Sequence, residues 1–393
     1  VGSEMCIRDR LSTQATVHGA GITLLPSLGT ATMSSPAVPI IVWCHPRSCS
    51  TAFERSFLQR ADTKVWHEPL GDPFYYGKQR ACRRYSEDEC RASEHYGSSV
   101  EQVARKVLAS SSGDGSSPPP RFVFIKDMAQ YVFSGTALHR LHPDSRVFPD
   151  TGADAPAKQN GVHANPTELP TALLRRFKHA FLIRTPEKSV PSYWKCVEEG
   201  AAGFSFFDGA ESGYVEQRLL YDWLSDPNST FHNPDEPDDP SLAAWPVQSQ
   251  PPSPPVVDAR VLLGNPGRTL QTFCDTLGVP FDPHMLSWDA GAVDIWAKWG
   301  TYHTVAQNST GFRADDGSDE AEKDLSQFPP EVQTTIAYVI HVHMQQLTDA
   351  ARICRHTGTF CPRSRSMINS SAPARIDTWP TGSRHNQDNP FVW

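Results

Sequence analysis

The chain has 393 residues, a formal net charge of −8 at pH 7 and 38% hydrophobic residues. The acidic balance argues against a nucleic-acid partner, and no stretch reaches the roughly 18 apolar residues of a membrane-spanning helix. The 34 prolines and the modest hydrophobic fraction are a poor mixture for two full cores. We therefore expect one domain over residues 38–360, with loop insertions near 110–120, 143–168 and 226–255, a disordered or non-native segment 1–37 and a polar tail 361–393.

Residues 39–57 run from an apolar strand into a turn of small residues and then into a helix that begins near Ser50. A parallel strand delivers such a turn to the carboxyl end of a sheet, where unpaired N–H groups of the helix attract an anion. Arg47 adds a positive fork, while Ser48, Ser50 and Thr51 add hydroxyl donors. The segment therefore predicts a phosphate-binding loop.

Two known phosphate-loop chemistries fit this turn poorly. A Walker loop needs glycines and a lysine that the turn lacks. A cysteine-dependent phosphatase needs a thiolate and an arginine at the spacing of Cys49 and Arg55. Its loop would enclose Phe53 and Glu54 where the phosphate has to sit. A phosphatase or nucleotide hydrolase stays open as an alternative function.

Polar side chains follow two further predicted strands. The block 65–76 follows the first helix as a returning second strand would, so Glu68 and its neighbour His67 are expected beside the phosphate loop. Lys126 follows the apolar strand 121–125. That position is the carboxyl end of a strand, where ligands bind in open α/β sheets.

Three later segments extend the pattern. Residues 179–195 indicate an apolar strand ending at Arg184, followed by a helix that carries Ser192. Residues 256–288 indicate a strand, a helix opened by Asn265-Pro266 and a stop at Gly278. A long helix from Pro330 to about Arg355 is expected to pack on the sheet through Ile336, Val339, Ile340 and Leu347.

The chain shows no metal-binding pattern. His341 and His343 lie in the apolar part of that long helix, and an HxH pair alone does not indicate a ligand set, so we expect no metal. The nine cysteines form no Cys-x-x-Cys pair and have no regular spacing. This usage is typical of a reducing compartment, and we expect a cytoplasmic protein with no membrane partner.

Two of these blocks resemble the cosubstrate motifs of sulfotransferases. One matches the loop that holds the 5′-phosphosulfate of 3′-phosphoadenosine 5′-phosphosulfate (PAPS), and it consists of Pro46, Arg47, Ser48, Cys49, Ser50 and Thr51. The block 179–195 looks like the 3′-phosphate motif, with Arg184 and Ser192 at its two positions. The segment 256–288 is similar to a stretch found in a sulfotransferase-like group, some members of which are joined to an aminotransferase-like half.

The resemblance implies a P-loop NTPase-like α/β/α sandwich with a central parallel sheet. It implies transfer of a sulfuryl group from PAPS to a hydroxyl of a small acceptor, a sugar or another metabolite, with 3′-phosphoadenosine 5′-phosphate (PAP) as product. In-line attack needs cations for the transferring oxygens and a base for the acceptor proton. Arg47 and Lys126 are the expected cations.

Glu68 stands where a branch of sulfotransferases acting on sugars carries its base. His67 competes with it, because imidazole has a pKa nearer to neutrality. The stretch 296–312 resembles in position the loop that closes over PAPS, so Ser309, Thr310 and Gly311 are further expected contacts. A non-catalytic nucleotide-binding protein of the same fold remains a second alternative function.

Overall fold

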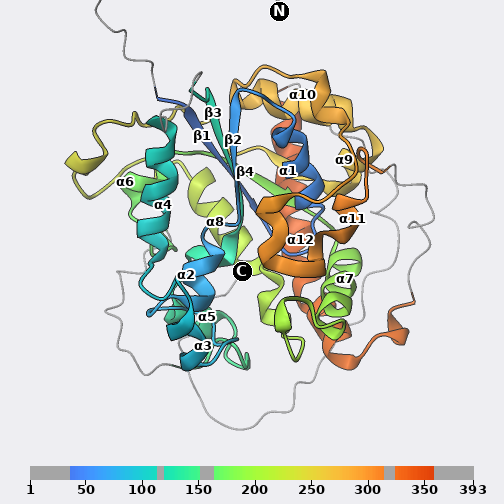
Figure 1. The fold of residues 1–393 in the computed structure, drawn as a ribbon. Coiled ribbons are helices and arrows are strands. Elements are labelled where there is room, and N and C mark those ends of the chain that lie inside the picture. Colours follow the sequence, from blue (N-terminus) through green and yellow to red (C-terminus); the bar gives the residue numbers. More distant parts are fainter. Residues whose placement is uncertain (1–35, 113–118, 151–162, 314–323, 358–393) are drawn as a thin grey trace, which may run out of the picture. The chain divides into compact units, whose positions relative to one another are not determined.

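The computed structural model describes residues 36–112, 119–150, 163–313 and 324–357. Within them, five parallel strands form one sheet in the order β2-β3-β1-β4-β5. The strands are β1 (Val38–Cys44), β2 (Thr63–His67), β3 (Phe122–Met128), β4 (Lys178–Ile183) and β5 (Val256–Asp258). Helices lie on both faces of the sheet (Figure 1), so the expected α/β fold with a central parallel sheet is confirmed.

The helices begin and end at residues with recognisable signals. Asn265 caps α10 through its side chain, and Gly278 ends the helix at φ 68°, as the sequence predicted. The α-helices are α1 (Ser50–Leu58), α2 (Gly71–Tyr76), α3 (Glu87–Ala92), α4 (Val100–Ala109), α5 (Gly135–Leu141), α6 (Thr171–Leu174), α7 (Pro186–Glu198), α8 (Tyr214–Ser225), α9 (Ala259–Gly264), α10 (Pro266–Leu277), α11 (Thr304–Gln307) and α12 (Pro330–Thr357). Two 3-10 helices also matter for the site, η4 (Gly209–Ser212) and η7 (Asp294–His303).

The order of the strands reverses beside β1. The chain passes from β1 to β2 and β3 on one side of it, and later crosses to β4 and β5 on the other side. In open parallel sheets, ligands bind outside the carboxyl ends of the strands at such a switch point. The ends of β1 and β4 are therefore where the topology favours a site.

Aromatic packing holds α1 against the sheet. Phe53 and Phe57 lie one turn apart and are both buried. The Phe57 ring stacks on Phe124 of β3 with centroids 3.8 Å apart, and Phe53 meets Phe273 of α10 edge to face at 5.0 Å. Each buried ring contributes about 1.5–3 kcal/mol. The first turn of α1 is thereby fixed relative to the end of β1.

The environment of α12 differs from the expectation. This helix packs mainly against α7 and α8 and not directly on the sheet. Its side chains Val332, Ile336 and Val339 form a separate apolar cluster with Val190 and Tyr214. The other two expected contacts are not core residues of that cluster, since Ile340 is half-buried and Leu347 lies outside the side chains described. An apolar stripe along a helix predicts which face of the helix is buried, but it does not predict which element packs against that face.

The expected insertion 226–255 is more than a surface loop. Phe231 and Leu242 are buried in the main core, and the backbone N–H of Thr230 donates to the carbonyl of His163 at 2.9 Å. Most of the expected N-terminal segment and C-terminal tail, with parts of the insertions near 110–120 and 143–168, lie outside the described residues. The expected domain limits therefore stay predictions.

Candidate active site

A cavity of about 470 Å³ opens at the carboxyl ends of the strands. Its walls come from residues at the ends of four strands: Arg47 after β1, Glu68 after β2, Met128 at the end of β3 and Arg184 after β4. Residues between 299 and 313 also line it. The lining brings together nine of the residues predicted from the sequence: Pro46, Arg47, Cys49, Ser50, Thr51, Glu68, Arg184, Ser309 and Gly311.

The loop between β1 and α1 contains two left-handed residues, Arg47 at φ 63° and Cys49 at φ 67°. For a residue with a side chain this conformation costs roughly 1–2 kcal/mol. Cys49 makes no side-chain cap for α1, and no acidic residue lies in the first turn. Because the first N–H groups of a helix have no partner within it, this end of α1 offers donors and a positive dipole to the cavity. The loop geometry is suited to an anion.

Two arginines from separate sequence motifs meet at this loop. Arg47 donates from Nε to the hydroxyl of Ser192 at 3.0 Å and from Nη1 to the carbonyl of Tyr302 at 2.6 Å. Arg184 donates from Nη1 to the carbonyl of Arg47 at 3.1 Å. Ser192 lies in α7 directly after Pro191, which the helix accommodates in its interior. Ser192 therefore contacts the Arg47 side chain and does not itself line the cavity.

His45 connects the ends of β1 and β4. Its Nε2 accepts the backbone N–H of Arg184 at 3.0 Å, and its Nδ1 lies 3.0 Å from the carbonyl of Pro46. These partners assign the proton to Nδ1. Burial lowers the pKa of His45 to about 3, so the ring is neutral near pH 7. His45 was not predicted as a site residue, although its place between a buried strand and the loop was a usable signal.

Glu68 reaches the cavity and forms a close ion pair with Lys126. Lys126 lies inside β3 and not after it as expected, because the ladder with β1 continues to Met128. The Lys126 side chain is fully buried and does not line the cavity. It contacts Glu68, which does line it. Burial by itself lowers the pKa of Lys126, but the carboxylates of Glu68 and Glu54 outweigh it and hold that pKa above its usual value.

A second set of polar side chains runs inward from the cavity wall. His303 lines the cavity, with Nδ1 3.0 Å from Thr51 Oγ1 and Nε2 3.1 Å from Nε2 of His67. Nδ1 of His67 lies 2.8 Å from Oε2 of Glu54, which also accepts from Nε1 of Trp296 at 2.9 Å. His67 thus faces Glu54 and His303 and does not line the cavity. Glu54 and His303 were not predicted as site residues.

Donor atoms of His67, Glu68 and His303 lie within 4.8 Å of one another, a spacing that a metal ion could bridge. The Glu68 carboxylate is already paired with the Lys126 ammonium. A second cation beside that ammonium is electrostatically unfavourable. The ion pair therefore argues against a metal ion at this place, and the expectation of no metal stays a prediction.

Part of the cavity wall is aromatic. The rings of Tyr75, Tyr131, Tyr193, Phe204 and Trp299 line it, together with the buried carboxylate of Glu211. Such a wall offers a bound ligand a large apolar contact area at a small cost in side-chain entropy.

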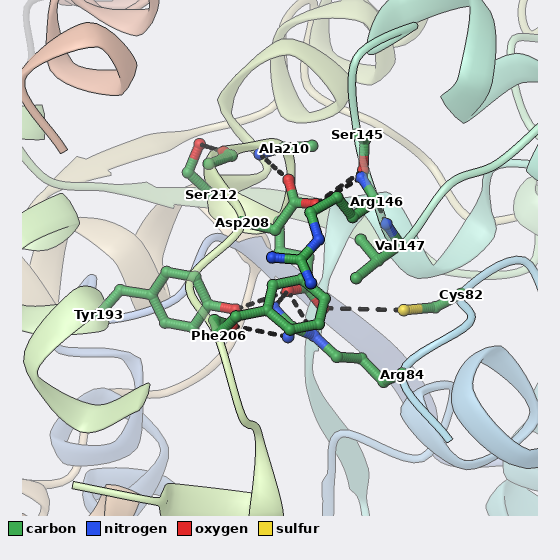
Figure 2. A network of polar contacts seen from close by, with 12 residues as sticks. Cys82, Arg84, Ser145, Arg146, Val147, Tyr193, Phe206, Asp208, Ala210 and Ser212 are labelled. Carbon is green, nitrogen blue, oxygen red and sulfur yellow. Dashed lines mark hydrogen bonds and ion pairs between the residues drawn. The ribbon is translucent and has the colours of Figure 1, made fainter. Parts of the chain in front are cut away.

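Arg84, which lies in the polar network of Figure 2, neutralises Glu211. It forms a close ion pair with Oε2, to which the hydroxyl of Tyr193 also donates at 2.9 Å. The Arg84 guanidinium also lies 4.2 Å from the centroid of the Phe206 ring, and that of Arg146 lies 3.7 Å from it. Glu211 is therefore compensated within the fold and adds little net charge to the cavity.

The C-terminal segment adds a cation that the sequence analysis missed, because Arg313 lines the cavity. The residues predicted there have structural partners instead. The hydroxyl of Ser309 donates to the carbonyl of Ala306 at 2.7 Å and accepts from the indole Nε1 of Trp288 at 3.1 Å. The carbonyl of Thr310 accepts from the backbone N–H of Trp288 at 3.2 Å. Ser309 lines the cavity, whereas Thr310 does not.

Arg55 does not lie where a cysteine-dependent phosphatase would need its arginine. The guanidinium of Arg55 donates to the backbone carbonyls of Asp289, at 2.5 Å, and Ala306. It fastens this segment to α1 and does not line the cavity. Cys49 therefore has no Arg55 beside it to cradle a phosphate.

The fold and this site define an α/β protein with a cavity lined by Arg47, Arg184 and the start of α1, and comparisons with known proteins narrow the class. Residues 252–327 match the family model described as the sulfotransferase domain. Branched-chain-amino-acid aminotransferase-like proteins 1 and 2 of Arabidopsis thaliana are 28% and 26% identical over 287 and 276 residues, which are 71% and 70% of this chain. The chain spans about a third of the length of these relatives, 37% and 36%.

Two solved structures are also similar, the sulfotransferase domains from the curacin biosynthetic pathway and from the Synechococcus PCC 7002 olefin synthase. They are 14% and 15% identical, with TM-scores of 0.37 and 0.35, and each match covers 77% of this chain and 97% and 95% of those chains. The expected resemblance to sulfotransferases with aminotransferase-like relatives is confirmed, and the family match includes β5, α9 and α10. Among the described residues, no helix is both long and apolar enough to cross a bilayer.

Proposed function

We propose that this protein transfers a sulfuryl group from PAPS to a hydroxyl group of a small acceptor. The observation that carries the proposal is the convergence of Arg47, Arg184 and the first turn of α1 on one cavity at the switch point of the sheet. Two motifs far apart in the sequence thereby form one cationic surface. The sulfotransferase-domain match over residues 252–327 supports the same class.

The residues present fit a nucleotide with anionic groups at both ends. The N–H groups at the start of α1 are available to hold the 5′ group, where PAPS would carry its sulfuryl group. Arg184 and Arg313 are the cations left for the 3′-phosphate. The buried hydroxyl of Ser48 has no hydrogen-bond partner, so the loop retains one unsatisfied polar group.

The reaction asks this chain for charge stabilisation and for a base. The acceptor oxygen bonds to sulfur while the bond from sulfur to the leaving phosphate breaks, so negative charge grows beside Arg47 and the start of α1. The acceptor proton needs a base within reach. Glu68 and His303 both line the cavity and can transfer a proton, and His303 is also hydrogen-bonded to His67. The role of Glu68 as the base, which the resemblance implies, remains a prediction.

The aromatic wall favours an acceptor that combines an apolar or planar face with a hydroxyl. Tyr75 and Tyr193 direct their hydroxyls to Glu211, at 3.3 and 2.9 Å, so their donors are already used. The ring faces then remain for contact with the acceptor. Sugars and aromatic alcohols both present such a combination.

Calorimetric titration of PAP into the full chain tests the cosubstrate, with adenosine 5′-phosphate as the control. We expect PAP to bind at least about tenfold more tightly, because a charged hydrogen bond contributes about 1.5–3 kcal/mol. Equal affinity for both nucleotides would overturn the assignment. PAP binding without a sulfated product from any acceptor would favour the non-catalytic alternative.

A further inference from the structure

Three side chains join the cavity to the fully buried carboxylate of Glu54 through a chain of hydrogen bonds. Thr51 and His303 line the cavity, and the chain continues through His67 to Glu54 with successive distances of 3.0, 3.1 and 2.8 Å. Glu54 is 0% exposed, and its side chain lies on the inner side of α1. A line of hydrogen bonds of this length can conduct a proton between its ends.

The partners at the buried end determine which way the hydrogen bonds point. Trp296 can only donate, and an ionised Glu54 can only accept. Nδ1 of His67 then carries its proton and donates to Glu54, which leaves Nε2 of His67 as an acceptor for Nε2–H of His303. Nδ1 of His303 in turn accepts from the hydroxyl of Thr51. With both rings neutral, every donor in the chain points toward Glu54.

The same chain can hold one more proton without forming an imidazolium. If Glu54 is protonated and donates to Nδ1 of His67, both rings take the opposite tautomer and Nδ1–H of His303 donates to Thr51. The two arrangements differ by a single proton and by the direction of every hydrogen bond. Oε1 of Glu54 has no hydrogen-bond partner, so the carboxylate end of the chain is not held by another donor at that oxygen.

We propose that Thr51, His303, His67 and Glu54 form a relay that accepts the proton of the acceptor hydroxyl, an inference that rests on the proposed sulfuryl transfer. As the acceptor oxygen bonds to sulfur, its proton passes to Thr51, and the proton of Thr51 passes to Nδ1 of His303. Nε2–H of His303 moves to Nε2 of His67, and Nδ1–H of His67 moves to Glu54. One proton leaves the cavity and one carboxylate becomes neutral, so the charges balance.

The surroundings of Glu54 favour this role. Burial raises the pKa of Glu54 to about 8, and the Lys126 ammonium partly offsets the burial. The other groups that face the carboxylate are Glu68 and His67 at the end of β2, Asp127 in β3 and the donor Trp296 in η7. The relay accepts a proton only when Glu54 is ionised, so turnover should rise as the pH increases toward about 8.

Tautomers of the two rings provide a readout that needs no acceptor. In the full chain with ¹⁵N-labelled histidine, lowering the pH should move the proton of His67 from Nδ1 to Nε2 and that of His303 from Nε2 to Nδ1 at one shared midpoint. In Glu54→Gln both rings should keep the high-pH tautomers, because an amide cannot take the proton. Rings that titrate separately to imidazolium, or an inversion that survives Glu54→Gln, would overturn the relay.

Glu216→Gln is the matched control, because Glu216 is also a fully buried carboxylate, bonded to Nε2 of His142 at 2.6 Å, and neither residue lines the cavity. It should leave the coupled inversion intact. With an acceptor in hand, Glu54→Gln should lower kcat about a hundredfold or more without changing PAP affinity. His303→Gln should cost a similar factor, and the double variant no more, since both interrupt one chain.

The competing base gives the deciding comparison. With both variants assayed under conditions where each is shown to be folded, a larger loss of kcat in Glu68→Gln than in Glu54→Gln would overturn the relay and assign the proton to Glu68. If the wild-type protein shows the coupled inversion of the histidine tautomers but does not bind PAP, the result would count against sulfuryl transfer and not against the relay.

Discussion

Nε of Arg47 donates to Oγ of Ser192 across 3.0 Å, although 145 positions separate the two residues in the chain. This contact joins the loop after β1 to the helix after β4. Each motif is a local pattern of strand, turn and helix. The two motifs form a candidate site because Arg47 and Arg184 line the same cavity.

Removal of the Arg47 side chain should weaken PAP binding. Arg47→Ala deletes a cation of the phosphate loop together with its bond to Ser192, so we expect a loss of about ten- to a hundredfold, the range of 1.5–3 kcal/mol for charged hydrogen bonds. Calorimetry measures the affinity. Arg91→Ala is the control, since that arginine is on α3 and its side chain is 64% exposed. Unchanged affinity in Arg47→Ala would remove this residue from the site.

The preference for a 3′-phosphate should depend on Arg184 and Arg313. Each variant to alanine is expected to reduce the affinity for PAP while leaving that for adenosine 5′-phosphate nearly unchanged, because only PAP carries the second phosphate. Competition binding with both nucleotides gives the ratio. An equal loss for both nucleotides in Arg184→Ala would mean that Arg184 supports the loop, through its bond to the Arg47 carbonyl, and not the 3′-phosphate.

The ion pair between Glu68 and Lys126 should make a large contribution to stability. Both side chains are at most 5% exposed, so Glu68→Gln leaves a buried ammonium without its closest counter-charge. Breaking a buried pair in this way costs about 3–5 kcal/mol. Urea unfolding measures the loss, and Lys126→Met added to Glu68→Gln should recover much of it. A change below about 1 kcal/mol in the single variant would contradict the pairing.

The His142–Glu216 pair predicts a pH-dependent stability. Burial lowers the pKa of His142, but the carboxylate of Glu216 outweighs burial and the net shift is upward. A histidine with a raised pKa adds stability that is complete below its usual pKa near 6.5 and disappears as the pH rises through the folded value. The free energy of unfolding of the wild type minus that of Glu216→Gln should therefore be larger at pH 6 than at pH 9. A difference that grows toward alkaline pH would show that the sign is wrong.

Much of the site could be predicted because it is built from local patterns. A buried strand, a turn of small residues and the start of a helix at Ser50 occur within one short segment, and parallel pairing brings the ends of such strands to one edge. The stop at Gly278 was predictable for the same reason, since a left-handed glycine ends a helix through its own backbone. These features depend on neighbours in the chain.

The sequence by itself therefore determined the parallel α/β architecture, the loop between the first strand and the first helix, and the placement of Arg47 and Arg184 at strand ends. Only the tertiary structure decided the partners: Lys126 under Glu68, Ser192 on Arg47, and His303 between Thr51 and His67. The physical reason is that the segment carrying His303 and Arg313 returns to the cavity far along the chain from the loop it contacts. Its register there is set by long-range contacts such as those of Arg55 with Asp289 and Ala306, which no local pattern encodes.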